Sequence, residues 1–399
     1  MRILYASHRP PYPFFLGGAA RCAHRLLQSL AREHGAACLA VGAADYQVTP
    51  WAVPADEDHA ALGILSVAQG GADAGRTDGP LPALDCGYPV RLLPDFGATL
   101  RQTIVDFEPD IVWSQLEGAF EALAMSREFG VQGLLYVHDA EDDPALLRRT
   151  AALSCHVVCS SAFLARKVSA VIGRPAHVVY PASDWCFGTV GDTAGFVTMV
   201  NPHAVKGLDT FLEVARRMPQ QRFLLQESWK LGDAALADLQ SRLAALPNVC
   251  FQHRVADMRA VYAQTRLLIA PSVWQEGFGM VVVEAQSCGI PVIASARGGL
   301  PESVGDGGML IEDYLEPAAW VEAMAPLLSD DQAYRDASAR AMRHAGSAEF
   351  MPKELARRLM AVCSAPAPRA GAFAHGLRTL REGLDKLVGW GRTVPGAGK

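Results

Sequence analysis

SVWQEGFGMVVVEA, at Ser272–Ala285, follows the short apolar run Leu267–Ala270 and precedes a Gly-x-Pro step at Gly289. The apolar run predicts a buried strand. The polar loop after it carries Glu276, and two glycines then open a helix that ends at Gly289. In α/β sheets, ligands bind at the carboxyl ends of strands, where helix N-termini offer free N–H groups to an anion. The stretch therefore predicts an anion-binding strand–loop–helix unit.

The glycines of this loop allow a ligand to come close to the backbone. Gly277 and Gly279 lack a Cβ, so a phosphate or a sugar can approach them. Glu276 would then face the group attached to the phosphate, and Glu284 would lie deeper along the helix. An ordinary glycine-rich turn is the alternative. The fixed order of two acids, two glycines, a second apolar strand and the Gly298-Gly299 loop favours a nucleotide-sugar site.

This order resembles the acid–seven residues–acid signature of the family 4 retaining glycosyltransferases, a group that includes sucrose synthases and bacterial mannosyltransferases. The resemblance is specific from about Asn248 to Ile311 and weaker over the rest of the chain. It implies the GT-B arrangement, in which two Rossmann-like domains face each other across a cleft, with the acceptor on the first and the donor mainly on the second. It also implies a nucleotide-diphospho-sugar donor carrying UDP or GDP, with no metal and no further cofactor.

Composition limits the other classes of function. The chain has 399 residues, enough for two domains with full cores, and a net charge of −6, which offers no basic field for nucleic acid. Its nine cysteines are odd in number and scattered, which is typical of reduced thiols in a cytosolic protein. Met1–Ser7 is predicted to be a strand, not a signal peptide, and no run reaches the ~20 apolar residues of a membrane span. We expect a cytoplasmic protein.

Short apolar runs alternate with helical stretches in two successive units, which predicts two doubly wound parallel sheets. The first domain would span residues 1–185, with an inserted excursion at 45–95 that is rich in Pro, Gly, Ala and Asp. The second would span 195–345, followed by C-terminal helices and a tail at 346–399. The strands predicted for the first domain are Arg2–Ala6, Ala37–Gly42, Asp110–Trp113, Gln132–His138, Cys155–Ser160 and His177–Tyr180, and within the excursion only Ile64–Val67 and Val90–Leu93 are strand-like. Those of the second begin with Phe196–Val200, Arg222–Gln226, Val249–Gln252 and Leu267–Ala270.

Helices are predicted where apolar residues recur at helical spacing. The predicted helices are Ala20–His34, Ala119–Phe129, Lys206–Met218, Asp233–Leu246, Met258–Gln264, Pro317–Leu328, Asp331–Ala345 and Glu349–Cys363.

Two features of the first domain are candidates for the same cleft. Gly17-Gly18 follows the first predicted strand, where a simple turn is the alternative. The resemblance implies a Gly-Gly loop near the donor phosphates and the acceptor. His138 ends an apolar run, and a lone histidine there is more often structural. The family has a histidine at the corresponding place that contacts the transferred sugar.

Basic residues of the second domain are candidates for the diphosphate and the base. Lys206 would supply a point charge at the mouth of the sheet. The family commonly has a basic residue about five positions earlier, where this chain has Asn201, which would leave one charge fewer on the pyrophosphate. His203 or Arg254 could compensate. Arg254-Val255 follows a strand where the family's backbone groups hold the nucleotide base.

An acidic run, Asp139–Asp143, follows His138 and raises a second possibility. Acidic pairs after strands bind Mg²⁺ or Mn²⁺ in the other large glycosyltransferase fold. That fold has a single sheet, whereas this chain predicts two. We therefore interpret the run as a solvated or acceptor-facing loop.

These assignments give a mechanism. Lys206 and the backbone N–H groups of Gly277, Phe278 and Gly279 would stabilise the leaving diphosphate, an electrostatic contribution that is usually the largest in catalysis. Glu276 would hold sugar hydroxyls, and Glu284 would accept hydrogen bonds from the ribose diol. The resemblance implies retention of the anomeric configuration through same-face attack assisted by the leaving phosphate.

The tail from Pro366 to Lys399 has six basic and two acidic residues. Its apolar residues recur on one helical face, at Phe373, Leu377, Leu380, Leu384 and Leu387. One interpretation is a helix packed on the protein itself or on a second copy. The other is a membrane-surface helix, which would place the protein at the inner membrane face and favour a lipid-linked acceptor.

Other functions stay open at this point. A GT-B sugar-nucleotide epimerase would turn over donor without acceptor, and a phosphorylase would require free phosphate. A non-catalytic nucleotide-sugar-binding subunit would bind nucleotide diphosphate without turnover. No motif identifies the acceptor, which could be a glycan, a lipid-linked sugar or a small molecule.

Overall fold

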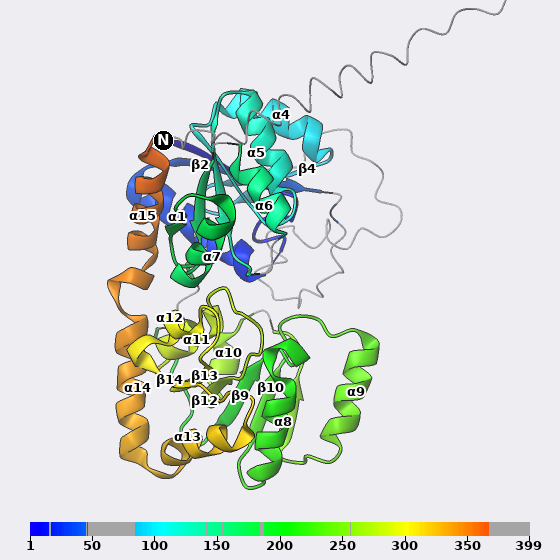
Figure 1. Cartoon of the computed structure of the whole chain (residues 1–399), viewed down its shortest axis with the longest axis vertical. Helices are drawn as coiled ribbons and strands as arrows, with labels where there is room; N and C mark the ends of the chain where they lie inside the picture. The colour runs from blue at the N-terminus through cyan, green and yellow to red at the C-terminus, as the bar shows by residue number, and fades with distance from the viewer. Residues whose placement is uncertain are drawn as a thin grey trace, which may run out of the picture.

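The structure is a computed structural model that describes residues 1–15, 17–44, 46, 84–140, 143–153, 155–183, 187–255 and 257–366. Most of the excursion predicted at 45–95, the Glu141–Asp142 pair and nearly all of the predicted tail lie outside the described residues. Two α/β domains lie one above the other along the long axis of the molecule (Figure 1).

The first sheet is parallel except at one edge, with the strand order β3-β4-β2-β1-β5-β6-β7-β8. The short edge strand β3 pairs antiparallel with β4. The strands are β1 (Arg2–Ser7), β2 (Ala37–Ala43), β3 (Leu84–Asp85), β4 (Pro89–Leu93), β5 (Ile111–Gln115), β6 (Gln132–Val137), β7 (His156–Cys159) and β8 (His177–Val178). The central strands are buried on both faces and are therefore nearly all apolar, as parallel sheets require.

Helices cover both faces of this sheet. On one face lie α1 (Gly18–His34) and, from the far end of the chain, α15 (Pro352–Ser364). The helices on the other face are α4 (Phe96–Phe107), α5 (Ala119–Glu128), α6 (Pro144–Ala151) and α7 (Ala162–Ile172). The resulting three layers place the carboxyl ends of the strands toward the second domain (Figure 1).

The second sheet is entirely parallel, in the order β11-β10-β9-β12-β13-β14. Its strands are β9 (Phe196–Val200), β10 (Phe223–Gln226), β11 (Val249–Gln252), β12 (Thr265–Ala270), β13 (Val292–Ser295) and β14 (Met309–Ile311). The strand order reverses between β9 and β12, which are neighbours in the sheet. In open α/β sheets a ligand crevice forms at such a switch point.

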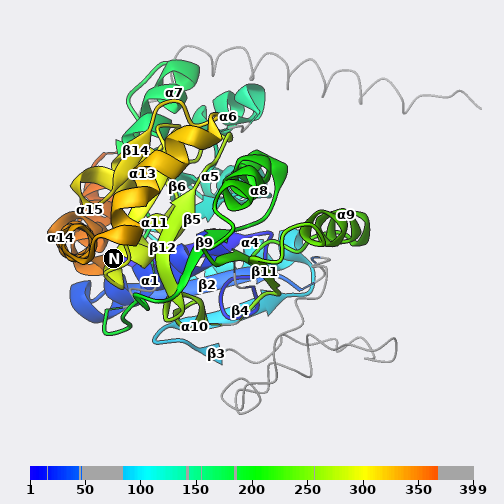
Figure 2. The same ribbon diagram turned by 90° about the horizontal axis from the view of Figure 1, so that it is seen from below.

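Helices also sandwich the second sheet (Figure 2). On one face lie α8 (Leu208–Arg217), α9 (Asp233–Leu243) and α13 (Pro317–Ser329). The other face carries α10 (Arg259–Tyr262), α11 (Met280–Ser287) and α12 (Leu300–Val304). The run Val281–Val283 favours a strand by propensity but lies within α11.

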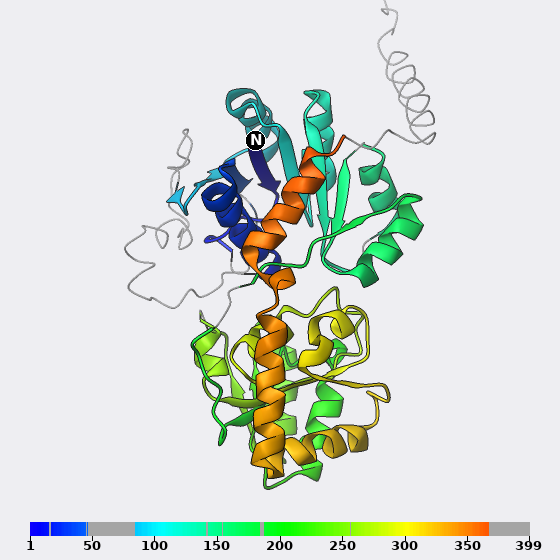
Figure 3. The ribbon, with the colours of Figure 1, turned by 90° about the vertical axis from the view of Figure 1, so that its left-hand side faces the viewer.

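The end of the described chain joins the two domains. Helix α14 (Asp331–Ala345) runs along the second domain, and α15 continues along the first, so the two together span the molecule (Figure 3). Leu355, Ala356 and Leu359 of α15 are buried in the core that α1 and the first sheet form. The predicted C-terminal segment thus contributes to the first domain, although it follows the second in sequence.

Several predicted elements differ from the structure in detail. The helix predicted over Lys206–Met218 is broken, because a 3-10 turn at Ala204–Lys206 ends at Gly207 and α8 begins only afterwards. Gly207 has φ +86°, and a Cβ there would lie 1.9 Å from the Pro271 carbonyl oxygen, so glycine is required. Strand β6 ends at Val137, which leaves His138 in the following loop. The cysteines in the described residues are free thiols, as the sequence predicted.

Candidate functional site

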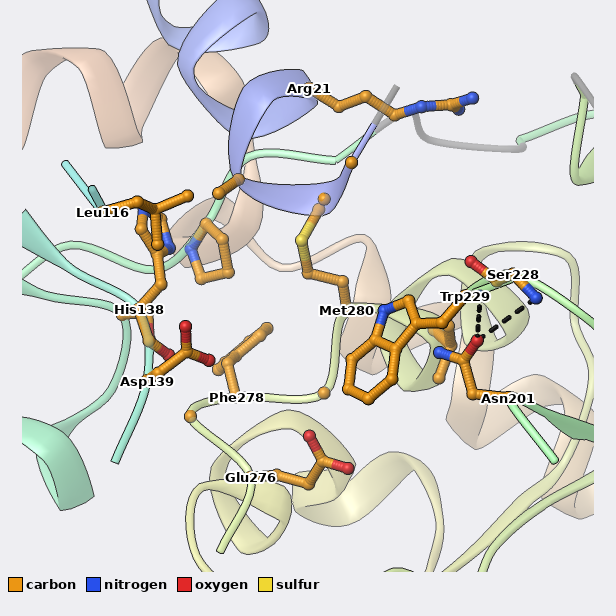
Figure 4. Close-up of a pocket in the computed structure, with 18 of the residues that line it drawn as sticks. Arg21, Leu116, His138, Asp139, Asn201, Ser228, Trp229, Glu276, Phe278 and Met280 are labelled. Atoms are coloured by element: carbon orange, nitrogen blue, oxygen red, sulfur yellow. Dashed lines mark hydrogen bonds between the residues drawn. The ribbon is translucent and has the colours of Figure 1, made fainter. Parts of the chain in front are cut away.

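A cleft of about 820 Å³ lies between the two domains, within the size range of small-molecule sites. Its walls come from loops at the carboxyl ends of strands in both sheets (Figure 4). All twelve residues that the sequence predicted for the site line this cleft: Gly17, Gly18, His138, Asn201, Lys206, Arg254, Val255, Glu276, Gly277, Phe278, Gly279 and Glu284. The twelve predicted residues therefore lie around one cleft. The role of each residue stays a prediction.

Lys206 and Glu276 form an ion pair in this cleft. The Lys206 Nζ donates to Glu276 Oε1 at 2.6 Å, and Ser272 Oγ donates to the same oxygen at 2.9 Å. Both charged side chains are largely shielded from solvent, with 11% and 15% of their surfaces exposed. A pair of this kind holds its two charges in fixed positions because each would be costly to bury alone.

The loop that carries Glu276 fits tightly against its neighbours through glycines. A Cβ on Gly277 would lie 1.9 Å from the carbonyl oxygen of His138, so the two domains touch at this point. Gly279 has φ +90°, and a Cβ there would meet Leu300 at 2.7 Å. The Gly299 N–H donates to the Glu276 carbonyl at 2.7 Å, which links the Glu276 loop to the Gly298-Gly299 loop. The glycines permit both the close domain contact and the turn into α11.

Asn201 has a local structural role that the sequence did not predict. Its φ is +65°, in the left-handed region that asparagine tolerates better than most residues. Its side-chain oxygen accepts hydrogen bonds from the backbone N–H groups of Ser228 at 3.2 Å and Trp229 at 2.6 Å (Figure 4). Asn201 thus fixes the loop after β10, whereas a basic residue there would place a charge in the cleft.

This loop presents Trp229 to the cleft. Trp229 is 47% exposed, and the Lys206 Nζ lies 4.5 Å from its ring centroid, in cation–π contact. The ring of His203 packs against it at 5.6 Å. Lys206 therefore lies between an aromatic face and the Glu276 carboxylate.

Glu227 organises the segment predicted to hold the base. Its carboxylate accepts from the N–H of Leu231 at 2.8 Å and of Arg254 at 3.3 Å, and His253 Nδ1 lies 3.3 Å away. Burial opposes the ionisation of Glu227, but these hydrogen bonds and the Arg254 charge outweigh it and lower its pKa. The resulting carboxylate holds the backbone of His253 and Arg254 in place beside the cleft.

Glu284 is held from two sides. Tyr262 donates its hydroxyl to Glu284 Oε2 at 2.6 Å, and Ser183, from the linker between the domains, donates to Oε1. A carboxylate oxygen can accept more than one hydrogen bond, so these two contacts do not by themselves exclude a ligand diol at Glu284.

His138 is partly buried at the edge of the cleft. Desolvation lowers its pKa to about 4, and its ring stacks on Tyr136 with 4.3 Å between centroids. Its Nε2 lies 2.9 Å from Oε1 of Gln115, the last residue of β5. A neutral imidazole at this place can exchange a hydrogen bond with a hydroxyl without adding charge.

Two acids of the run after His138, Asp139 and Asp143, lie in the described residues, and both line the cleft. Asp139 faces the cleft, where loss of hydration raises the pKa of its carboxyl despite the nearby Lys206 charge. Asp143 also lines the cleft, and it caps helix α6 by accepting from the Ala145 N–H at 2.8 Å. Among the residues that the structure describes, no group of three His, Cys, Asp or Glu side chains is placed to hold a metal ion.

Further hydrogen bonds join the two domains outside the residues that line the cleft. Glu302 of α12 accepts hydrogen bonds from the N–H groups of Ala162 at 2.6 Å and Phe163 at 2.7 Å, which begin α7 of the first domain. Its negative charge is favourable at this helix N-terminus. Lys167 of α7 donates to Gln275 Oε1 at 2.9 Å.

The sequence did not indicate the roles of Gln115, Trp229 and Glu302. Gln115 lies in an apolar strand and Trp229 in a loop without a motif, so only their spatial neighbours reveal them. Glu302 was part of the Gly-Gly-x-x-Glu stretch, but its partner on α7 is 140 positions away.

Comparison with known proteins supports the second domain most directly. Residues 191–330 match the family model described as glycosyl transferases group 1. A D-inositol 3-phosphate glycosyltransferase from Corynebacterium efficiens is 34% identical over 142 residues, which covers 33% of each chain. The enzyme of the same description from Segniliparus rotundus is 33% identical over 195 residues, covering 45% of this chain and 41% of that one. The chain thus matches about a third to two fifths of the length of these curated relatives.

Solved structures agree with the whole fold. The structure of HepE from Anabaena in complex with UDP-glucose has a TM-score of 0.69 at 18% identity, covering 91% of this chain and 99% of that one. Sucrose-phosphate synthase from Thermosynechococcus elongatus has a TM-score of 0.67 at 15% identity, covering 90% and 98%. The expected GT-B fold, with two parallel-sheet domains, is confirmed.

Proposed function

With a glycosyl transferases group 1 domain at residues 191–330 as the premise, we propose that this protein is a retaining glycosyltransferase. It would move a sugar from a nucleotide-diphospho-sugar to a hydroxyl acceptor. The observation that carries the proposal is the Lys206–Glu276 pair, with 2.6 Å between Nζ and Oε1, in a cleft that both domains line. It combines a cation for a leaving diphosphate with a carboxylate for sugar hydroxyls.

The chemistry follows from charge development. The bond between the anomeric carbon and the diphosphate oxygen breaks, and its electron pair leaves with the diphosphate. Lys206 and the N–H groups around Gly277 and Gly279 stabilise that negative charge, at positions fixed before the reaction. The acceptor oxygen attacks the anomeric carbon from the same face, and its proton passes to the leaving phosphate oxygen. Glu276 orients the sugar through its hydroxyls.

We propose a UDP-sugar as the donor to test first. HepE, which shares the fold, has been solved with UDP-glucose. In this chain, Glu227 holds the Arg254 backbone beside Val255, where a base would lie, and Glu284 would receive the ribose hydroxyls. GDP-sugars are the second candidates.

The acceptor wall favours an uncharged acceptor. The described acidic residues that line the first-domain side of the cleft are Glu117, Glu121, Asp139 and Asp143. Arg9 and Arg21 are the described basic residues on the same side, and Arg9 pairs with Glu117 at 2.5 Å between Nη2 and Oε1, so the four acids outnumber the bases. A phosphorylated acceptor such as inositol phosphate would meet this negative wall at a cost, so we propose a neutral sugar or polyol hydroxyl as the acceptor.

The first experiment is a binding panel. A ligand at 100 times its Kd stabilises the folded protein by about 2.7 kcal/mol, which a melting curve resolves. We expect UDP and UDP-sugars to raise the Tm more than GDP and its sugars. Donor turnover is then measured with neutral and phosphorylated acceptors, and the anomeric configuration of the product is determined by NMR.

Two outcomes would overturn the proposal. Activity that is lost in EDTA and restored by Mg²⁺ or Mn²⁺ would replace the metal-independent mechanism. Binding of nucleotide diphosphate without turnover on any acceptor would favour a non-catalytic subunit.

A further inference from the structure

Gln115 is a fully buried polar side chain directly behind the cleft. It ends strand β5 and pairs in register with Tyr136 of β6, two residues before His138. Its Nε2 donates to the carbonyl oxygen of Ala19 at 2.9 Å, and its Oε1 lies 2.9 Å from His138 Nε2. One amide thus connects two predicted site segments, the Gly17-Gly18 loop at the start of α1 and the histidine.

The two contacts determine which way the amide points. A carbonyl oxygen can only accept, so the NH₂ end of Gln115 must face Ala19. The oxygen end then faces His138. Because that oxygen cannot donate, the proton between them must belong to His138 Nε2. The remaining ring nitrogen, Nδ1, keeps its lone pair.

We propose that Gln115 is a positioning residue that fixes the neutral Nε2–H tautomer of His138, so that Nδ1 accepts a hydrogen bond from a hydroxyl of the bound sugar. The role toward the sugar rests on the proposed function, whereas the tautomer assignment stands on the geometry alone. A histidine fixed in this way distinguishes hydroxyl donors from groups that can only accept.

Two further observations support the assignment. Desolvation lowers the pKa of His138 to about 4, so the ring is neutral at pH 7 and carries one proton, on either Nδ1 or Nε2. The opposite tautomer would place the Nε2 lone pair against Gln115 Oε1, so that two acceptors would face each other at 2.9 Å, which is unfavourable. The Tyr136 ring, stacked at 4.3 Å, restricts reorientation of the imidazole.

The test is the tautomer itself. The full chain is labelled with ¹⁵N-histidine, and long-range ¹H–¹⁵N spectra at pH 7 report which ring nitrogen of each histidine carries the proton. The His138 signals are assigned by their absence in a His138→Asn variant. We expect a protonated Nε2 and an unprotonated Nδ1. A protonated Nδ1, or an averaged mixture of both forms, would overturn the proposal without any variant of Gln115.

Variants of Gln115 then test the cause. Gln115→Leu removes the acceptor, so His138 should become a mixture of tautomers. Gln115→Glu keeps an oxygen that can accept from Nε2–H and should restore the parent tautomer. Gln286→Leu is the matched control, because Gln286 is equally buried and donates to the Val304 carbonyl at 2.9 Å, away from His138. A pure Nε2–H form in Gln115→Leu would refute the role of Gln115.

Kinetic and binding measurements distinguish a failure of this proposal from a failure of the proposed function. With UDP-glucose as donor, Gln115→Leu should lower kcat at least tenfold while the Kd for UDP stays within twofold of the parent, since UDP lacks the sugar. Equal kcat values for Gln115→Leu and Gln286→Leu would contradict the role toward the sugar. If the parent turns over no donor, the proposed function fails, and the tautomer spectra still decide whether Gln115 orients His138.

Discussion

At the residue scale, Lys206 and Glu276 each determine where the charge of the other lies. Because Lys206 also contacts the Trp229 face, its ammonium has two partners in the free protein and would gain a third in a bound diphosphate. Glu276 is held in turn by Ser272. The pair is therefore organised before any donor arrives, which is the condition for electrostatic stabilisation of a leaving group.

Replacing Glu276 tests whether its carboxylate lies near the sugar of the donor, away from the nucleotide base. Glu276→Gln should lower kcat by on the order of 10²–10³-fold, the usual effect of losing a preorganised electrostatic contact. UDP binding should persist or strengthen, because Lys206 loses a competing anion. The measurements are donor turnover and UDP titration calorimetry, with Glu213→Gln on α8, which does not line the cleft, as control. Turnover equal to that of the parent would falsify the placement of Glu276 in the site.

Replacing Lys206 should have the complementary effect. Lys206→Ala removes a charge-assisted contact to the diphosphate, which costs about 1.5–3 kcal/mol, or roughly 10- to 150-fold in Kd. UDP and UDP-sugar should weaken together, as calorimetry would measure. Lys353→Ala on α15 is the control. Undiminished UDP affinity in Lys206→Ala would make the ion pair with Glu276 purely structural.

The sequence predicts a site residue well when the residues that it acts with lie close to it in the chain. Gly277, Gly279 and Glu276 lie within one strand–loop–helix unit, so their spacing alone indicates that they share a cleft. Asn201 shows the limit, because its departure from a basic residue suggested only a lost charge. Its hydrogen bonds to the Ser228 and Trp229 backbones depend on a left-handed turn and on a loop 27 positions away, neither of which a single sequence reveals.

At the element scale, the predicted strands were the most accurate, because parallel strands buried on both faces are continuous apolar runs. Helices α4, α6 and α7 were not predicted. Each buries only three residues against the sheet, which is too few to give a clear helical pattern in the sequence. The break at Gly207 was missed for a similar reason, since the close Pro271 carbonyl that requires it lies in another loop.

The loop between β12 and α11 supports a prediction at this scale. Gly277→Ala would place a Cβ 1.9 Å from the His138 carbonyl oxygen, so either the loop or the domain contact must move. A displacement of about 1 Å in a site can cost ~10²-fold, and we expect donor turnover to fall at least tenfold. Gly232→Ala is the matched control, because a Cβ there meets nothing within 4 Å. Equal activity of the two variants would show that the observed contact is not needed for turnover.

At the scale of the whole molecule, two connections set the relation of the domains. Helix α15 returns to the first domain and buries Leu355 and Leu359 in its core, which no local pattern could predict because the partner surface is built from the opposite end of the chain. Phe278 of the site loop stacks on Tyr180 at 5.1 Å, beside Phe350, where the chain passes between domains. The described helices include none with the length and apolar character needed to cross a bilayer.

Glu302 supports the last prediction, because it joins the domains without lining the cleft. Its carboxylate accepts from the Ala162 and Phe163 N–H groups at the start of α7, an interaction of about 1–2 kcal/mol for a partly buried acid at a helix N-terminus. Glu302→Ala should therefore shift an open–closed equilibrium toward the open form by roughly 5- to 30-fold.

Small-angle scattering measures this shift directly. The radius of gyration of Glu302→Ala should exceed that of the parent and decrease when UDP-sugar is added, since a ligand that contacts both domains favours the closed form. Glu322→Ala, an exposed acid on α13, is the control. A radius of gyration equal to that of the parent, together with unchanged donor turnover, would mean that α15 and the Phe278–Tyr180 stack alone hold the domains, and that Glu302 only caps α7.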